Sequence, residues 1–390
     1  MNRNGLLLAP GLAMLLLAPA GAQVPQGASL GALGQPGPQV LRADYARTRT
    51  VISPVIHADH RVTLKLNAPE AHDVRATGHI IGPNAHWLSK DRSLPMTKGV
   101  DGIWSITLGP LKPDIYDYGY TVDGVAASDP GNRLNLVEVP GPSPAYYDAR
   151  DVPHGDVHMV VYHSKAIGGA RYLRVYTPPG YSTSRKYPVL YLQHGLGNTS
   201  TEWVQRARAP IIADNLIAEG RMVPMIIVFP SGNATATPAD EKQGDRTQAA
   251  YGQPYYDDLL KDIIPFVEAT YSVQTDRVNR GIAGMSMGSG QALNIGLTNL
   301  DRFAWIAVVA PAPNTRPPAE LMPDPAALKQ LKLFWLSVGN RDALYRVAQG
   351  VHSYATEKGI AHTWRVDTNA HDTGAMGANF YHFAQKLFKE

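Results

Sequence analysis

The sequence predicts a mainly parallel α/β domain preceded by a small all-β domain. Its 390 residues favour two domains, because single hydrophobic cores rarely grow beyond roughly 250–300 residues. Across residues 49–148, short alternating runs are separated by turn residues, which is typical of a β-sandwich. Across residues 149–390, buried apolar runs alternate with helical patterns, which is typical of a mainly parallel sheet with helices on both faces.

The first 22 residues have the features of a secretory signal peptide. Arg3 supplies a positive charge, and the apolar stretch from Leu6 to Ala18 is too short to span a bilayer stably. Small residues at Ala20-Gly21-Ala22 predict cleavage after Ala22, and therefore a periplasmic or secreted protein; the alternative is an uncleaved membrane anchor. Residues 23–48 are rich in Gly, Pro, Gln and Ala, which predicts a flexible leader.

The composition excludes several classes of site. The chain has no cysteine, which rules out a disulfide framework, a thiol nucleophile and a thiolate metal site. The formal net charge is +3 and no long Lys/Arg run occurs, so we expect no nucleic-acid partner. No later stretch is apolar enough to span a membrane, so we expect no stable membrane insertion. The oligomeric state is left open.

The predicted β-sandwich contains two clear alternating runs. Arg61–Leu66 alternates polar and apolar residues, and Tyr116–Val122 places three Tyr and one Val on one face. Trp104 and this Tyr stripe suit either a sugar-stacking platform or the sandwich core, and the core is the commoner arrangement. The Pro-rich stretch Pro140–Pro144 reads as an exit linker.

The predicted α/β domain contains several buried strands and one long amphipathic helix. We expect the helix at Tyr255–Tyr271, where apolar residues recur at helical spacing. The expected strands are Val189–Leu192, Met225–Phe229, Ile282–Gly284, Ile306–Val309, Leu333–Val338 and His362–Val366.

A candidate nucleophile, Ser286, lies in the motif Gly284-Met285-Ser286-Met287-Gly288. A strand precedes the motif and a helix follows it, so Ser286 occupies a sharp strand-to-helix turn. We expect strained backbone at Ser286, with the two glycines removing side chains that would collide there. The backbone N–H of Met287 begins the helix and is a candidate oxyanion donor.

The partners of Ser286 are predicted by the rule that parallel sheets bind ligands beyond the carboxyl ends of their strands. Asp342 follows the Leu333–Val338 strand, and His371 follows His362–Val366. The order Ser286, Asp342, His371 is the chain order of α/β-hydrolases, with His371 as base and Asp342 as the acid that orients it. The alternative for His371 is a solvated loop histidine.

Other acids and histidines near these strands are weaker candidates. Asp367 is the best rival acid, whereas Asp372 adjoins His371 and is poorly placed to orient its ring. His362 begins its strand and lies at the wrong end, and His382 falls in the expected terminal helix.

The second oxyanion donor is expected in the loop Gln193-His194-Gly195-Leu196-Gly197. This loop directly follows an early strand, and the N–H of Leu196 is our candidate, with Gly195 as the nearest alternative. His194 is interpreted as a buttress of the loop rather than a second base.

Two further features carry weaker hypotheses. Trp203 and Arg206 follow the expected oxyanion loop and are candidate substrate contacts. Arg206 with Arg208 would suit a carboxylate or anionic catecholate, although a solvated helix face is the commoner arrangement. His57-Ala58-Asp59-His60 lacks a third ligand at convincing spacing, so we expect no metal and no cofactor.

The second domain resembles the esterase D / feruloyl esterase family, which includes enterochelin esterases and mycolyltransferases. The first domain resembles an Ig-like module related to glycogen- and starch-binding modules, on Trp104, Tyr116–Tyr120 and Asp123-Gly124. The segments that carry the family resemblance are Tyr187–Gly195, Glu202-Trp203, Asp214–Gly220, Asp262–Glu268 and Arg280–Gly288.

The resemblance implies a secreted serine carboxylic ester hydrolase acting through an acyl-serine, most simply a feruloyl or acetyl esterase on plant polysaccharide such as arabinoxylan. The alternatives are a ferric siderophore esterase of the enterochelin type, or a glycan-binding protein with a relict hydrolase domain. Family members often have Trp soon after the catalytic His, but here the segment is Ala370–Met376 without an aromatic residue. The acyl group and the alcohol are therefore left open.

Overall fold

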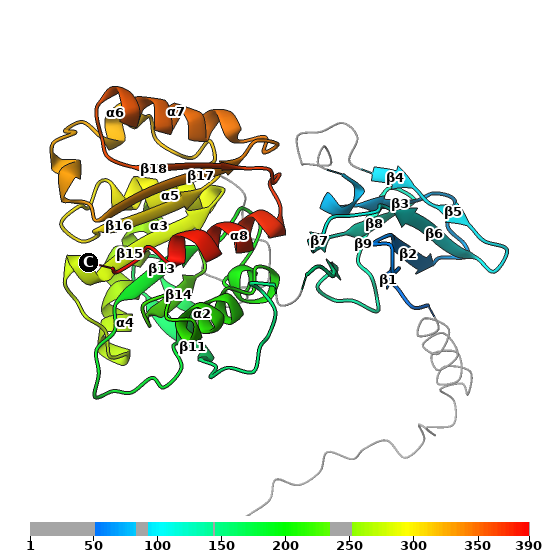
Figure 1. Ribbon diagram of the computed structural model, residues 1–390, viewed down its shortest axis with the longest axis horizontal. Coiled ribbons are helices and arrows are strands. Elements are labelled where there is room, and N and C mark those ends of the chain that lie inside the picture. Colours follow the sequence, from blue (N-terminus) through cyan, green and yellow to red (C-terminus); the bar gives the residue numbers. More distant parts are fainter. Residues whose placement is uncertain (1–50, 83–92, 143–144, 235–251, 390) are drawn as a thin grey trace, which may run out of the picture. The chain divides into compact units, whose positions relative to one another are not determined.

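The computed structural model describes residues 51–82, 93–142, 145–234 and 252–389 (Figure 1). The predicted signal peptide and leader lie outside these residues, as does part of the predicted exit linker. The described residues belong to one compact unit, and the boundary expected near residue 148 stays a prediction. Among them, no helix is both long and apolar enough to cross a membrane.

A single eight-stranded sheet organises residues 156–367. Its strand order is β11-β12-β14-β13-β15-β16-β17-β18, and the last six strands in this order run parallel to one another. β11 and β12 form an antiparallel hairpin at one edge. The bounds are β11 Asp156–Ser164, β12 Gly169–Thr177, β13 Val189–Gln193, β14 Ile226–Pro230, β15 Arg280–Met285, β16 Trp305–Val309, β17 Leu333–Gly339 and β18 Thr363–Asp367.

The mainly parallel sheet that the sequence predicts is therefore confirmed, as an α/β-hydrolase sheet. The edge hairpin was not predicted, because β11 exposes Val157, Met159 and Val161 and has no continuous buried run. The inner strands β13, β14 and β16 are buried along their whole length because both of their faces are covered, whereas the edge strand β18 is partly exposed. In β13, for example, Leu190 and Leu192 enter one hydrophobic core, whereas Val189 and Tyr191 enter the other.

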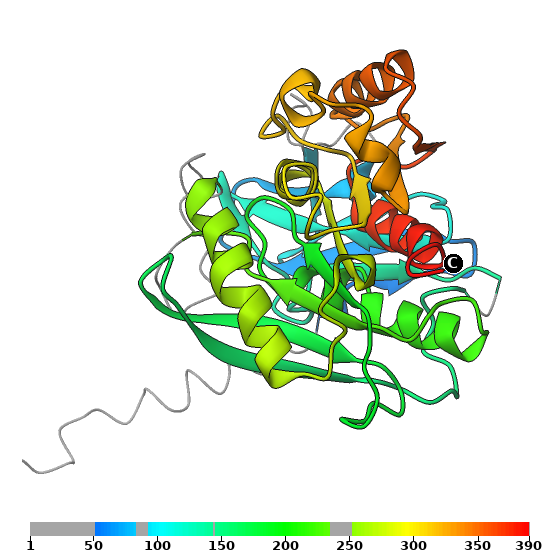
Figure 2. The same ribbon diagram turned by 90° about the vertical axis from the view of Figure 1, so that its left-hand side faces the viewer.

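Helices cover both faces of this sheet (Figures 1 and 2). α2 and α8 pack into the first core, α3, α4 and α5 pack into the second, and α7 lies against β17. The helical bounds are η2 His79–Ile81, η3 Glu202–Arg206, α2 Ala209–Ala218, α3 Gln253–Asp258, η5 Leu259–Ile263, α4 Ile264–Thr270, η6 Arg277–Asn279, α5 Met287–Gly296, α6 Pro318–Leu321, η7 Ala327–Gln330, α7 Tyr345–Glu357 and α8 Thr373–Ala384.

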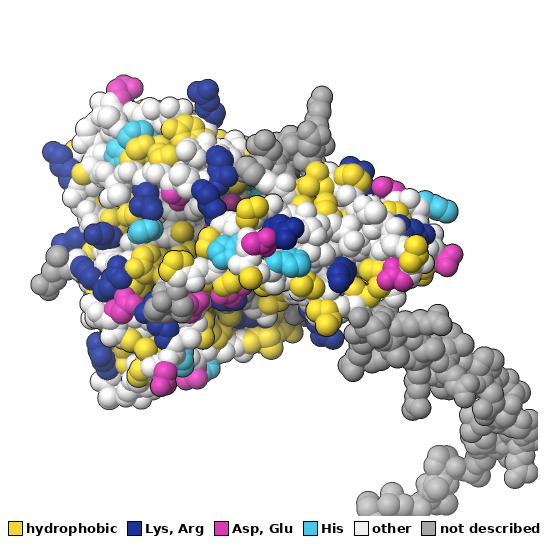
Figure 3. Space-filling model, turned by 45° about the vertical axis from the view of Figure 1, so that its right-hand side comes forward, with side chains coloured by type: hydrophobic (Ala, Val, Ile, Leu, Met, Phe, Trp, Pro, Cys, Tyr) yellow, Lys and Arg dark blue, Asp and Glu magenta, His cyan; other side chains and the backbone are white. Residues whose placement is uncertain are grey.

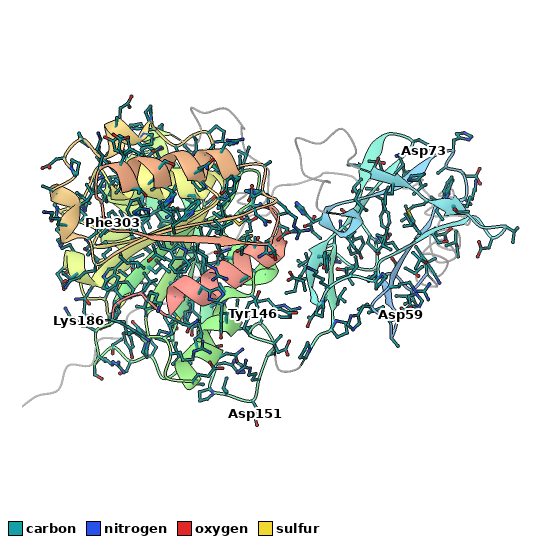
Figure 4. The ribbon with its side chains drawn as sticks, turned by 45° about the horizontal axis from the view of Figure 1, so that its top comes forward. Asp59, Asp73, Tyr146, Asp151, Lys186 and Phe303 are labelled. Atoms are coloured by element: carbon teal, nitrogen blue, oxygen red, sulfur yellow. The ribbon has the colours of Figure 1, made fainter. Side chains whose placement is uncertain are left out.

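Tyr146 lies beside α8, with its ring 5.0 Å from that of Tyr381 (Figure 4).

The helix expected at Tyr255–Tyr271 is present as one run through α3, η5 and α4. Its middle segment, η5, is a π-helix that ends at Ile263, and Pro265 lies in the first turn of α4 that follows it. Proline has no N–H to complete an α-helical hydrogen bond, and a locally wider turn accommodates that loss.

The N-terminal β-rich region consists of antiparallel sheets around a third core. Two four-stranded sheets, β1-β2-β6-β5 and β4-β3-β8-β9, both contribute to this core, and β10 pairs with β7. The bounds are β1 Val55–Ile56, β2 Val62–Asn67, β3 Val74–Thr77, β4 Ser93–Pro95, β5 Thr97–Lys98, β6 Ile103–Leu108, β7 Asp114–Asp117, β8 Gly119–Val122, β9 Val125–Ala127 and β10 Leu136–Val139.

The prediction of one continuous strand at Tyr116–Val122 was wrong, because the strand breaks at Tyr118. Before the break β7 pairs with β10, and after it β8 pairs with β3 and β9, so the two halves serve different sheets. Tyr118 and Tyr120 are buried in the third core together with Trp104, and the Tyr118 hydroxyl donates to Asp129 at 2.8 Å. These placements support the interpretation of the aromatic stripe as core.

A buried ion pair ties the edge hairpin to the helical run. Arg171 Nε on β12 lies 3.2 Å from Asp258 Oδ2 on α3, and both side chains are buried. The hydroxyl of Tyr162 on β11 donates to the same carboxylate oxygen at 2.7 Å. Hydrogen bonds to Asp258 therefore offset part of the cost of burying its charge.

Replacing Asp258 by Ala should destabilise the protein by about 3–5 kcal/mol, because it leaves the Arg171 guanidinium buried without its counter-charge. Urea unfolding would measure this loss. Asp257→Ala is the matched control, since Asp257 lies at the surface, where it pairs with Lys261 at 3.2 Å and accepts from Gln253 Nε2 at 2.9 Å, and its loss should change stability by about 0.5 kcal/mol. Equal losses in the two variants would contradict the prediction.

Candidate active site

Ser286 lies at the joint between β15 and α5, with φ 58° and ψ −124°. A positive φ is uncommon for a residue with a side chain and is found where the surrounding structure enforces it. Here β15 ends at Met285 and α5 begins at Met287, so one residue must reverse the chain. The Ser286 N–H donates to the carbonyl of Val309 on β16 at 2.9 Å, which fixes this turn against the sheet.

The glycines on either side of Ser286 are required by close backbone contacts. A Cβ at Gly284 would lie 2.4 Å from the carbonyl oxygen of Gly288. A Cβ at Gly288 would lie 2.6 Å from the carbonyl oxygens of both Gln193 and His194. Real Cβ atoms do not approach backbone so closely, which explains the glycine spacing in the sequence motif.

Asp342 and His371 come together beyond the ends of β17 and β18. His371 Nδ1 lies 2.8 Å from Asp342 Oδ2, and the Asp342 side chain is buried. The other carboxylate oxygen, Oδ1, accepts the N–H of Leu344 at 2.8 Å, so the carboxylate is held in one orientation. Ser286 and His371 both line one cavity of about 1050 Å³.

The rival residues are engaged elsewhere. Asp367 accepts hydrogen bonds from Asn379 Nδ2 at 3.0 Å and from the Asn369 N–H at 2.9 Å. Asp372 caps the first turn of α8. His362 interacts with His352, with 2.8 Å between ring nitrogens. Of the acids considered, the structure pairs only Asp342 with His371 among the residues that it describes.

The loop after β13 is held by two buried side chains. The carboxylate of Glu202 accepts the Gly195 N–H at 2.8 Å, and burial raises the pKa of Glu202 although this hydrogen bond opposes the shift. His194 Nδ1 lies 2.7 Å from the Gly195 carbonyl, and its Nε2 accepts the Gly232 N–H at 2.7 Å. His194 thus buttresses the loop, as expected. Because the Gly195 N–H is occupied, Leu196 is the better candidate donor.

Leu196 and Met287, the two candidate oxyanion residues, both line the cavity that contains Ser286. Arg206 also lines it. Trp203 does not reach it: its side chain is buried, its Nε1 donates to the Gln193 carbonyl at 2.8 Å, and its ring packs near Phe380. The suggestion that Trp203 contacts substrate is therefore corrected. Trp203 is therefore a core residue whose hydrogen-bonded indole supports the loop after β13.

The β-rich region contributes residues to the same cavity that sequence patterns did not reveal. His79 and Asp117 line it, with 2.6 Å between His79 Nδ1 and Asp117 Oδ1. Arg206 Nη2 lies 3.8 Å from the same carboxylate oxygen and donates to Thr373 Oγ1 at 3.3 Å. Nothing in the local sequence links these residues, because they come from separate elements joined only by tertiary packing.

Charge interactions favour the ionised form of both His79 and Asp117. Burial opposes the charged form of each residue, but the hydrogen bond and opposite charge of Asp117 outweigh it and raise the pKa of His79 above 6.5. The same hydrogen bond, with the charges of His79 and Arg206, lowers the pKa of Asp117 below 3.8.

Two further expectations concern a metal site near His57 and the surroundings of Arg208. Within the described ranges, no group of three His, Cys, Asp or Glu residues is arranged to hold a metal ion, and His57 instead pairs with Thr63 at 2.7 Å. Arg208 forms an ion pair with Glu138 at 2.7 Å. On the face drawn in Figure 3, basic and acidic side chains are interspersed with apolar ones.

Comparison with known proteins gives a consistent family. The family model described as "Putative esterase" matches residues 164–373, which is more than half of the 390-residue chain. The endo-1,4-beta-xylanase/feruloyl esterase of Xylanibacter ruminicola is 27% identical over 351 residues, covering 86% of this chain. This chain spans only 46% of that relative's length. It is also 31% identical over 153 residues to endo-1,4-beta-xylanase Y of Acetivibrio thermocellus, a match that covers 36% of this chain and 13% of that relative.

Solved structures agree with this assignment. The ferulic acid esterase of Anaeromyces mucronatus is 27% identical with a TM-score of 0.55, covering 63% of this chain and 95% of that one. The enterochelin esterase of Shigella flexneri has a TM-score of 0.61 and covers 86% of this chain and 96% of that one, but at 14% identity it shows the fold alone. On the family match, the chain belongs to the esterase family of α/β-hydrolases.

Proposed function

We propose that this protein hydrolyses carboxylic esters through an acyl-serine at Ser286, acting on hydroxycinnamoyl or acetyl esters of plant polysaccharide. The observation that carries the proposal is the shared cavity of Ser286 and His371, with Asp342 hydrogen-bonded to the far side of the His371 ring. The names of the relatives support the substrate class, since the Xylanibacter ruminicola and Anaeromyces mucronatus proteins are feruloyl esterases. The predicted signal peptide suits polysaccharide substrates outside the cell.

The proposed acylation step uses the three side chains in separate roles. The Ser286 hydroxyl attacks the ester carbonyl carbon while His371 Nε2 accepts its proton. Asp342 keeps the opposite nitrogen, Nδ1, protonated and stabilises the imidazolium that forms. The N–H groups of Met287 and Leu196 stabilise the oxyanion. When the tetrahedral intermediate collapses, the carbon–oxygen bond of the ester breaks and His371 returns the proton to the departing alcohol.

Deacylation repeats the sequence with water as nucleophile. His371 takes a proton from water, the resulting hydroxide attacks the acyl-serine, and the carboxylic acid leaves as Ser286 recovers its proton. The two steps together consume one ester and one water, and they release one alcohol and one acid. No step requires a metal or cofactor.

We also propose that the β-rich region forms part of the active-site rim rather than acting only as a separate glycan-binding module. Its contribution is the hydrogen-bonded pair of His79 and Asp117 beside Arg206 on the cavity wall. Trp104 and the Tyr118–Tyr120 stripe are buried, so they offer no stacking surface to a sugar.

Ser286→Ala should abolish ester hydrolysis, because the covalent intermediate cannot form. The activity of the mature protein on methyl ferulate, acetylated xylan, p-nitrophenyl acetate and enterochelin would test this, together with labelling by a fluorophosphonate probe. Turnover of enterochelin alone would favour the siderophore alternative, and no labelling would favour a relict site. Full activity in Ser286→Ala would overturn the proposed mechanism.

Asp342→Asn should lower kcat by about 10³–10⁴-fold, because an amide at this position favours the wrong tautomer of His371. Asp367→Asn is the matched control, since Asp367 also follows a strand end but bonds Asn379 and Asn369. Steady-state kinetics on p-nitrophenyl acetate would measure both variants. A larger loss of kcat in Asp367→Asn than in Asp342→Asn would instead assign Asp367 as the acid that orients His371.

His79→Gln should reduce stability by about 1 kcal/mol near pH 5.5, with a smaller loss at pH 9. The stabilisation that His79 contributes is complete below pH 6.5 and is lost as the pH rises through its raised pKa. The stabilisation that Asp117 contributes is complete above pH 3.8 and is lost only as the pH falls through its lowered pKa. Urea unfolding at both pH values would measure this difference. His57→Gln is the control without an acid partner, and a pH-independent loss in His79→Gln would contradict the expectation.

A further inference from the structure

One wall of the cavity presents hydrogen-bond donors that the proposed mechanism does not use. Tyr256 on α3, Asn294 on α5 and Arg316, in the chain after β16, all line the cavity that contains Ser286. Tyr256 is 8% exposed and Asn294 is 2% exposed, so two of the three are nearly buried.

The orientation of the Asn294 amide follows from its neighbours. The backbone N–H of Arg316 can only donate, and it meets Asn294 at 2.9 Å, so the facing atom must be Oδ1. The other amide atom is then Nδ2, which donates to the Tyr256 hydroxyl oxygen at 2.8 Å and to the Asn314 carbonyl at 2.9 Å. Asn294 is thereby fully satisfied.

This orientation determines the role of the Tyr256 hydroxyl. Its oxygen accepts from Asn294, so its own proton is left to donate, and within the described residues the hydroxyl forms no second hydrogen bond. The Arg316 guanidinium lies 6.0 Å from the centroid of the Tyr256 ring, and within the described part of the chain it forms no ion pair. Arg206 differs, because Asp117 already lies beside it.

We propose that Tyr256 and Arg316 form a subsite for a carboxylate group carried by the ester substrate. This inference rests on the proposed esterase function and narrows its substrates to esters with a second, anionic group. A carboxylate accepts hydrogen bonds from a hydroxyl and a guanidinium together, and the planar guanidinium matches its two oxygens. A neutral apolar group would leave the buried Tyr256 proton without an acceptor.

The carboxylate can belong to the acid or to the alcohol part of the ester, and matched substrate pairs distinguish the two. For the acid part, p-nitrophenyl pentanoate and p-nitrophenyl hydrogen glutarate have five-carbon acyl chains that differ by a terminal carboxylate. For the alcohol part, phenyl acetate and 4-acetoxybenzoate differ by a carboxylate on the ring. We expect a preference for the anionic member in one of the two pairs.

Arg316→Gln should lower kcat/KM for the preferred anionic ester about tenfold, as expected for the loss of one charged hydrogen bond. It should change kcat/KM for the matched neutral ester by no more than about twofold. Tyr256→Phe should lower the same ratio, since it removes only the donating hydroxyl. Arg185→Gln is the matched control: Arg185 lies 5.1 Å from the Tyr187 ring in the same cation–π arrangement but does not line the cavity. Equal losses for both members of each pair would overturn the subsite.

Binding of glutarate provides a readout that does not depend on turnover. Calorimetric titration should detect glutarate binding to the wild-type protein, with a loss of affinity of about tenfold in Arg316→Gln and no change in Arg185→Gln. Turnover of neutral esters without glutarate binding or anionic preference would remove this inference and keep the proposed function. Glutarate binding that depends on Arg316 without turnover of any ester would remove the function and keep the subsite.

Discussion

The backbone at Ser286 is the constraint on which the proposed site depends. A residue with positive φ joins β15 directly to α5, and the carbonyl of Val309 on the neighbouring strand accepts its N–H. Such a conformation persists only where the surroundings determine it, and here parallel strands on both sides of β15 supply that rigidity. Gly288 allows the loop after β13 to approach α5, and Gly284 allows the first turn of α5 to approach the end of β15, more closely than any side chain would permit.

The loop after β13 is the second rigid component, and its rigidity comes from buried polar groups. Glu202 is buried and accepts the Gly195 N–H, while His194 contacts the Gly195 carbonyl and the Gly232 N–H. Burying a carboxylate is unfavourable unless its hydrogen bonds are satisfied, which makes this loop sensitive to any change at Glu202. Trp203 contributes by filling the space beneath the loop.

The part of the site that the sequence predicted lies at strand ends. Ser286 directly follows β15, and Asp342 and His371 lie in the loops that follow β17 and β18, so strand order and the geometry of parallel sheets were sufficient to predict that they meet. His79 and Asp117 escaped prediction because they belong to an antiparallel region whose packing has no local signature. Trp203 was misplaced because an aromatic residue beside an active-site loop has the same sequence pattern whether it faces the cavity or the core.

The position of His371 in the topology has a consequence for how the protein responds to heat. His371 follows β18, the last strand of the sheet, which pairs with β17 alone. Ser286, by contrast, follows β15, which has a strand on each side. Sheet edges open locally at lower free energy than sheet centres, so fraying at β18 would separate His371 from Ser286 while the central strands are still intact. Loss of activity on warming should therefore precede loss of the hydrophobic core.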